Sequence, residues 1–265
     1  MQTHLDSLLT KKYLIAALAA SASVNLVSNL LGKDATILVG NYSYIPITGS
    51  LMVLSLMMIV RYGMSGQHAL AWFAFGSYAV CSFIAETLWL VQELYLKVET
   101  FPSTPDIFYL VSYPFLLMFF VAYFQPVRSA ITKKMLTAPI LFSIAILAVG
   151  IAFTTGAGSD LTLFKTALGT SYQIFDAIVI IPALVGVSLF FKGKVNLMWT
   201  LFCFGMVLVF VADTAFLFAQ NDGSYYTGNP MEVLFSWNYI LMAFGVYSHL
   251  SMFGKPKANK FEDLR

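Results

Sequence analysis

Eight apolar runs, each about 20 residues long, constrain this chain more than any other feature of its sequence. A helix needs about 20 apolar residues to cross the hydrocarbon core of a bilayer, which is about 30 Å thick. Only 11% of the residues are charged, whereas a soluble domain carries about 25%. The runs cover residues 13–31, 42–61, 69–92, 106–125, 135–154, 169–191, 196–219 and 231–253.

These runs are apolar on all sides, which is typical of lipid-facing helices and not of the alternating strands of a membrane β-barrel. In lipid, each segment must also satisfy its own backbone hydrogen bonds, as an α-helix does. We therefore predict an all-α integral membrane protein with eight transmembrane helices. Four prolines fall in or near the ends of these runs, and we expect each to kink its helix without ending it: Pro46, Pro114, Pro139 and Pro182.

Lys and Arg residues are distributed unevenly between the two ends of these runs. Three of the 15 fall on one side, namely Lys33, Lys97 and Lys165. The others fall on the opposite side: Lys11, Lys12, Arg61, Arg128, Lys133, Lys134, Lys192, Lys194, Lys255, Lys257, Lys260 and Arg265. Because cationic loops stay in the cytoplasm, we predict a multi-pass plasma-membrane protein with both termini cytoplasmic. The basic residues are then explained as topology signals, and nothing favours nucleic-acid binding.

The second half of the chain repeats features of the first. "KKYLIA" at 11 returns as "KKMLTA" at 133, and "FIAETLWLVQE" (83–93) returns as "FVADTAFLFAQ" (210–220). Ser43-Tyr44 matches Ser171-Tyr172, and "DIFYLVSY" (106–113) aligns with "EVLFSWNY" (232–239). Such internal similarity predicts two tandem, parallel four-helix repeats. We assign residues 1–128 to the first repeat, 129–254 to the second and 255–265 to a cytoplasmic tail.

Three acidic residues fall deep inside the apolar runs, away from their ends. Glu86 and Asp213 occupy matched positions in the repeated phrase, and Asp176 lies at a similar depth in another run. A charge at mid-membrane costs about 2.5–3.5 kcal/mol on insertion scales, so such a residue should face the bundle interior or a wet cavity. We expect a functional role, the alternative being a protonated acid that only joins helices. Asp106 and Glu232 are instead interpreted as helix starts, where the helix dipole stabilises a carboxylate.

Aromatic and polar residues at the same depth complete a predicted cavity that opens to the outside. We expect the ligand-binding residues to be Glu86, Asp213, Asp176, Tyr109, Tyr113, Tyr239 and Asn238. Asn25 and Asn29 are further candidates for its wall. Such a cavity suits a small molecule or cation from the outer side, such as an amine or a lipid headgroup.

Other kinds of site find less support in the sequence. The histidines, His4, His68 and His249, all fall near the cytoplasmic side, away from the acids, so we expect no metal site. The chain has no Gly-rich phosphate loop, GxSxG, HExxH or paired CxxC motif. We assign no catalytic residue, name no cofactor and lean away from an enzyme.

"PSTPDIFYLVSYP" (102–114) resembles a signature of the polytopic membrane input domain that precedes diguanylate cyclase and histidine kinase modules in some bacterial signalling proteins. The matching residues are Pro102, Ser103, Asp106, Tyr109, Leu110, Tyr113 and Pro114. The stretch 212–244 is similar to that family's second signature, through Gly223, Tyr225, Gly228 and Pro230. The resemblance covers about residues 65–250 and implies a sensing module. No kinase or cyclase follows the last helix, so we expect signalling through a separate partner or a membrane complex.

A weaker likeness is to the lysoplasmalogenase-type hydrolases, which are also eight-helix bundles with paired acids on their third and seventh helices. Glu86 and Asp213 would take those parts, although no counterpart of that family's histidine is found on the following helix. The alternatives to a sensor are therefore an intramembrane lipid hydrolase, a transporter or a structural subunit of a membrane complex.

Overall fold

The computed structural model describes residues 2–66, 68–155, 163–193 and 195–252, and its regular elements in these ranges are all helical. The predicted tail, 255–265, lies outside the described residues. The eight α-helices are α1 (Gln2–Leu30), α2 (Lys33–Tyr62), α3 (Ala69–Leu90), α4 (Thr104–Phe124), α5 (Lys133–Thr155), α6 (Leu163–Leu189), α7 (Asn196–Asn221) and α8 (Val233–Met252). A π-helical turn, Val91–Leu96, extends α3, and short 3₁₀ turns occupy Gln125–Ala130 and Pro230–Glu232.

Seven of these helices, α1 to α7, are long and apolar enough to cross a membrane. The helix α8 has 20 residues, among them Asn238, His249 and several with hydroxyl groups, and it is not among the seven. The predicted all-helical architecture is thus confirmed for the described residues, and its long apolar helices are those of a multi-pass membrane protein by length and composition. The side on which each end lies, and α8 as the eighth span, stay predictions.

Two helix boundaries differ from the prediction because apolar runs mark only the lipid-soluble part of a helix. The helix α2 begins at Lys33, nine residues before the predicted start at 42, and α1 reaches back to Gln2. Gly32, with φ of +105°, permits the sharp reversal between them. Asp34 in the first turn of α2 is favoured by the helix dipole, so the polar start is stable.

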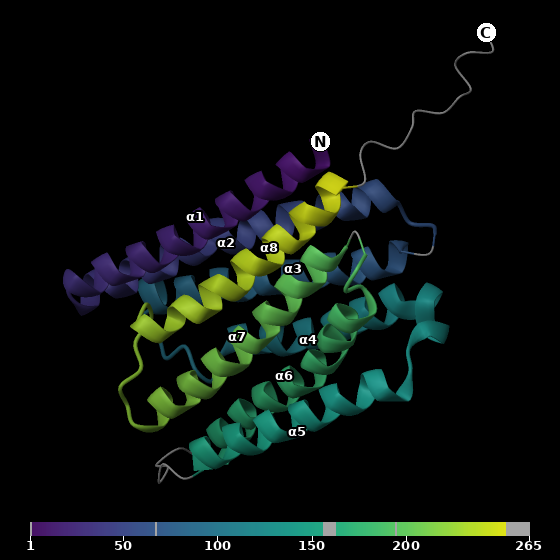
Figure 1. The fold of residues 1–265 in the computed structure, drawn as a ribbon. Coiled ribbons are helices and arrows are strands. Elements are labelled where there is room, and N and C mark those ends of the chain that lie inside the picture. The colour runs from purple at the N-terminus through teal and green to yellow at the C-terminus, as the bar shows by residue number, and fades with distance from the viewer. Residues whose placement is uncertain (1, 67, 156–162, 194, 253–265) are drawn as a thin grey trace.

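Six helices form a ring, and two lie outside it. Following the ring, α2 packs on α3, α3 on α4, α4 on α6, α6 on α7, α7 on α8 and α8 on α2. The helix α1 packs against α2 and α8, and α5 packs against α6 and α7. Figure 1 shows α1 and α5 at opposite edges of the bundle.

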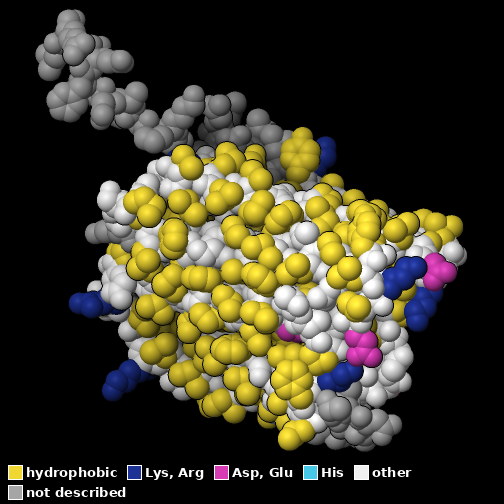
Figure 2. Space-filling model, turned by 180° about the vertical axis from the view of Figure 1, so that it is seen from behind, with side chains coloured by type: hydrophobic (Ala, Val, Ile, Leu, Met, Phe, Trp, Pro, Cys, Tyr) yellow, Lys and Arg dark blue, Asp and Glu magenta, His cyan; other side chains and the backbone are white. Residues whose placement is uncertain are grey.

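The bundle has two distinct ends, which we name here. At the acidic end, α1, α3 and α7 finish and α2, α4, α6 and α8 begin, and at the terminal end α1 begins and α8 finishes (Figure 1). Figure 2 shows a face that is mostly apolar, with charged side chains near its edges. Val60, which is 83% exposed, illustrates how this surface presents apolar side chains where a soluble protein would carry polar ones.

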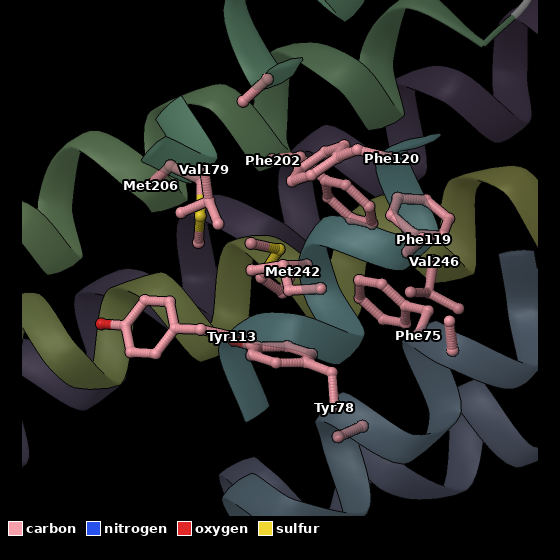
Figure 3. Close-up of a cluster of buried hydrophobic side chains, with 14 of the residues drawn as sticks. Phe75, Tyr78, Tyr113, Phe119, Phe120, Val179, Phe202, Met206, Met242 and Val246 are labelled. Carbon is pink, nitrogen blue, oxygen red and sulfur yellow. The ribbon is translucent and has the colours of Figure 1, made fainter. Parts of the chain in front are cut away.

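Aromatic side chains fill the ring toward the terminal end. The rings of Phe75 and Phe202 stack with centroids 5.1 Å apart, and Trp199 stacks on Phe124 at 5.1 Å. Figure 3 shows this cluster extending from Phe119 and Phe120 on one side to Tyr113 on the other. Because the interior is densely packed here, the remaining space within the ring lies toward the acidic end.

Candidate functional site

A cavity of about 110 Å³ lies inside the ring, and all six ring helices contribute to its wall. Four acids and seven tyrosines line it among other residues. The acids are Glu86, Asp106, Asp213 and Glu232, and the tyrosines are Tyr44, Tyr78, Tyr109, Tyr113, Tyr172, Tyr225 and Tyr239, of which Tyr225 belongs to the α7–α8 connection.

Glu86 of α3 projects into this cavity and is paired with a tyrosine of α8. The Tyr239 hydroxyl donates to Glu86 Oε1 at 2.9 Å. Tyr109 of α4 is a second hydrogen-bonding neighbour of the Glu86 carboxyl group. This acid, only 9% exposed, is therefore held by two phenol hydroxyls and not by a cation.

Asp213 of α7 and Asp176 of α6 share a tyrosine of α4. The Tyr113 hydroxyl lies 2.7 Å from Asp176 Oδ1 and 3.4 Å from Asp213 Oδ2. Asp213 lines the cavity, whereas Asp176 is fully buried behind Tyr113 and does not line it. The structure thus brings the three predicted intramembrane acids to one end of the ring.

Asp106 and Glu232 lie at helix starts, and their side chains also line the cavity. Asp106 does accept from the Ser103 backbone N–H at 2.6 Å, as a capping acid should, but it also accepts from the Tyr172 hydroxyl at 2.7 Å. Glu232 accepts from the Gly228 N–H at 2.8 Å and from the Tyr225 hydroxyl. Both acids line the cavity, so the helix-start interpretation described only part of their role.

Residues at corresponding positions of the two predicted repeats form corresponding hydrogen bonds. Tyr44, the predicted counterpart of Tyr172, donates to the Glu232 backbone oxygen at 3.0 Å and lies 3.5 Å from Oε2. In each case a tyrosine of one predicted repeat meets an acid of the other. Four tyrosines make these bonds: Tyr113 to Asp176 and Asp213, Tyr239 to Glu86, Tyr172 to Asp106, and Tyr44 to Glu232.

The α7–α8 connection forms one wall of the cavity and is fixed by α1. Asn25 and Asn29 donate to the Gly228 carbonyl at 2.8 and 2.9 Å. Gly228 has φ of +84°, and a Cβ there would lie 2.6 Å from the Thr36 carbonyl oxygen, so only glycine fits. Neither asparagine lines this cavity; Asn25 instead lines an adjoining cavity that shares Tyr44 and Glu232 with it.

The ionisable groups that line the cavity include acids and no basic residue. Its lining residues, all within the described ranges, include no Lys, Arg or His. Burial raises the pKa of Glu232, which precedes α8, to about 7, although hydrogen bonds from Tyr225 and Gly228 oppose the shift. The cavity therefore has only acidic and neutral groups with which to meet a ligand.

The described residues contain no group of three or more His, Cys, Asp or Glu side chains placed to hold a metal ion. His249 lies near the terminal end of α8, with Nε2 3.1 Å from the Tyr123 hydroxyl. The acids of the cavity thus offer hydrogen-bond acceptors spread around its wall, an arrangement suited to a ligand larger than a single ion.

Six of the seven predicted site residues line the cavity: Glu86, Asp213, Tyr109, Tyr113, Tyr239 and Asn238. Their binding of a ligand stays a prediction. The prediction did not include Tyr78, whose signal was weak because it stands in an apolar stretch without a matched partner. A comparison of the chain with protein-family models, curated proteins and solved structures finds no match.

Proposed function

We propose that the protein binds a small organic cation in this acidic, tyrosine-lined cavity and passes the signal to a separate partner. The observation that carries the proposal is the composition of the wall: four acids and several tyrosines, with no Lys, Arg or His among the lining residues. Carboxylates attract a cation, and phenol rings stabilise ammonium groups through their π faces. An anionic ligand would meet repulsion and no compensating positive charge.

The size of the cavity favours a compact ligand. A cavity of about 150 Å³ holds a benzene molecule, and the volume here is about 110 Å³. An ammonium group bearing a few methyl groups has this scale. A cation without methyl groups, such as an inorganic ion, would leave much of the tyrosine wall without contact.

Binding would act on the way the two halves of the chain pack together. The matched tyrosine–acid bonds, such as Tyr113 to Asp176, Tyr172 to Asp106 and Tyr239 to Glu86, cross from one predicted repeat to the other. A cation that draws a carboxylate toward itself competes with these bonds and shifts the population of packing arrangements. With the acidic end outside the plasma membrane, as the charge distribution predicts, the change would reach the cytoplasmic loops and a partner there.

The matched bonds also favour the predicted duplication. Unrelated halves would have no reason to place a tyrosine and an acid at corresponding positions four times. The outer helices are less regular, because α1 packs on α2 and α8 whereas α5 packs on α6 and α7. We therefore extend the proposal to two four-helix units whose ring helices have kept a common arrangement.

Tetramethylammonium is the probe for the first experiment, with tert-butanol as an uncharged control of similar shape. Thermal unfolding of the purified protein should shift upward with tetramethylammonium, since a ligand at 100 times its Kd stabilises the folded state by about 2.7 kcal/mol. The shift should be lost in a Glu86→Gln, Asp213→Asn double variant that still folds. Lys33, on the outside of the ring, gives a matched control through Lys33→Gln, which should keep the shift.

Absence of any shift in the wild type, or an equal shift with tert-butanol, would overturn the cation proposal. The lipid hydrolase remains the competing function, because two acids could activate and orient a water molecule. Release of free alcohol or aldehyde from single-chain ether lipids, lost in the same double variant, would establish the hydrolase instead.

A further inference from the structure

A second feature of the site is a buried acid that does not line the cavity. Asp176 is fully buried on α6, and its Oδ2 has no hydrogen-bond donor. Its Oδ1 accepts from the Tyr113 hydroxyl at 2.7 Å, and the same hydroxyl lies 3.4 Å from Asp213 Oδ2, so the two carboxyl groups meet at one phenol. A buried carboxylate oxygen left without a donor destabilises the folded protein.

We propose that Asp176 and Asp213 share one proton, and that binding of a cation in the cavity releases this proton. Two ionised carboxylates have only acceptors, so neither could donate to the other. One proton between them supplies the missing donor and removes the repulsion of two like charges. The inference rests on the proposed function, because the cation is the ligand that would displace the proton.

The pair of Asp176 and Asp213 has no full counterpart in the first predicted repeat. Four residues after Tyr172 stands Asp176, whereas four residues after the matched Tyr44 stands Thr48. Thr48 is also fully buried, and its hydroxyl donates to the Tyr44 carbonyl at 2.7 Å, which leaves it satisfied within its own helix. At these matched positions the first half has Glu86 and Thr48, whereas the second half has the two acids Asp213 and Asp176. Because Thr48 fills the corresponding position in the first half, packing of the ring does not require a carboxyl group at Asp176.

The surroundings of the pair contain no positive charge that could neutralise it. From α4 it faces Tyr113 and, farther away, Asp106. From α6 it faces Tyr172, and from α3 Tyr78. The helix α5 packs on both α6 and α7, and residues 135–155 of this helix include no titratable group. A proton is therefore the positive charge that neutralises the pair, because no neighbouring side chain supplies one.

The exchange balances simply. The O–H bond of the shared carboxyl group breaks, the proton passes to water and then to the buffer, and the cation takes its place as the counter-charge of Asp213. Nothing is oxidised or reduced. Because Asp213 lines the cavity and Asp176 does not, the cation would contact Asp213 and act on Asp176 through it.

Titration calorimetry with tetramethylammonium at pH 7, in phosphate and in HEPES, tests the inference. These buffers differ in ionisation enthalpy, so the difference in observed heat gives the number of protons released per cation. The wild type should release close to one proton. Asp176→Asn should still bind and release almost none, because the amide supplies the donor. Asp34→Asn, a change to an exposed acid in the first turn of α2 that does not line the cavity, should keep the release.

An infrared difference spectrum of the wild type gives a second measurement that needs no variant. The C=O band of a protonated carboxyl group should disappear when tetramethylammonium binds. Binding without proton release would overturn this inference and leave the proposed function standing. Release that persists in Asp176→Asn would assign the proton elsewhere and overturn it as well. Failure of tetramethylammonium to bind the wild type would overturn both proposals.

Discussion

Replacement of Tyr113 by phenylalanine should destabilise the folded protein through one lost hydroxyl group. The change keeps the ring but removes the 2.7 Å hydrogen bond to Asp176 Oδ1, in a carboxyl group that is fully buried and has no donor at Oδ2. A buried polar group left without its partner costs about 1–3 kcal/mol. In a chain of about this size, each kcal/mol lowers the melting temperature by about 2–4 °C.

Thermal unfolding in a single detergent measures the shift, and a double-mutant cycle assigns it. Asp176→Leu removes the acceptor with little change in shape, so the Tyr113→Phe, Asp176→Leu double variant should lose less stability than the two single variants together, by about 1 kcal/mol or more. Tyr247→Phe on α8, at a side chain that is 44% exposed, is the control and should stay within about 0.5 kcal/mol of the wild type. Additive losses, or an unchanged Tyr113→Phe, would refute the reasoning.

Two further predictions concern packing and pH. A Cβ at Gly186 would lie 2.0 Å from the fully buried Trp199 ring, so Gly186→Ala should lower the free energy of unfolding by about 1–3 kcal/mol in the same assay. Gly49→Ala is the control, because a Cβ there would make only ordinary contact at 3.5 Å, and it should be neutral or stabilising by up to about 1 kcal/mol. Equal effects of the two variants would contradict the α6–α7 packing. Burial raises the pKa of Glu232 from 4.5 to about 7, so the native state binds more protons than the unfolded state in that window, and the free energy of unfolding should fall by at most about 3 kcal/mol as the pH rises through it. Glu232→Gln should flatten this slope in unfolding curves recorded at pH 4.5 and above, and a slope equal to that of the wild type would count against it.

The helices could be predicted because lipid imposes one strong rule on apolar runs. Pro46 and Pro182 show how strong the rule is, since α2 and α6 continue through them as expected. The beginning of α2 at Lys33 escaped prediction because polar residues can extend a helix beyond the apolar run without leaving a signal in hydropathy.

The candidate site was predictable where charge stood out against an apolar background. Glu86 and Asp213 are conspicuous for that reason, and their matched phrases pointed to a common location. The role of Asn29 could not be foreseen, because it depends on a contact with Gly228, which is 199 residues away in the chain. Likewise, sequence spacing alone does not reveal that Asp176 stands behind Tyr113 and not in the cavity wall.

The attachment of the α7–α8 connection to α1 has a mechanical consequence. In the most apolar window of α1 only 11% of the residues are buried, against 56% in α3, so α1 is held mainly by its lipid surroundings. Helices of this kind adjust their tilt to bilayer thickness. A thicker or thinner membrane would consequently pull on Asn25 and Asn29, and through them on the segment that carries Tyr225 into the cavity. Under the proposed function, lipid composition would then affect cation binding without a lipid entering the cavity.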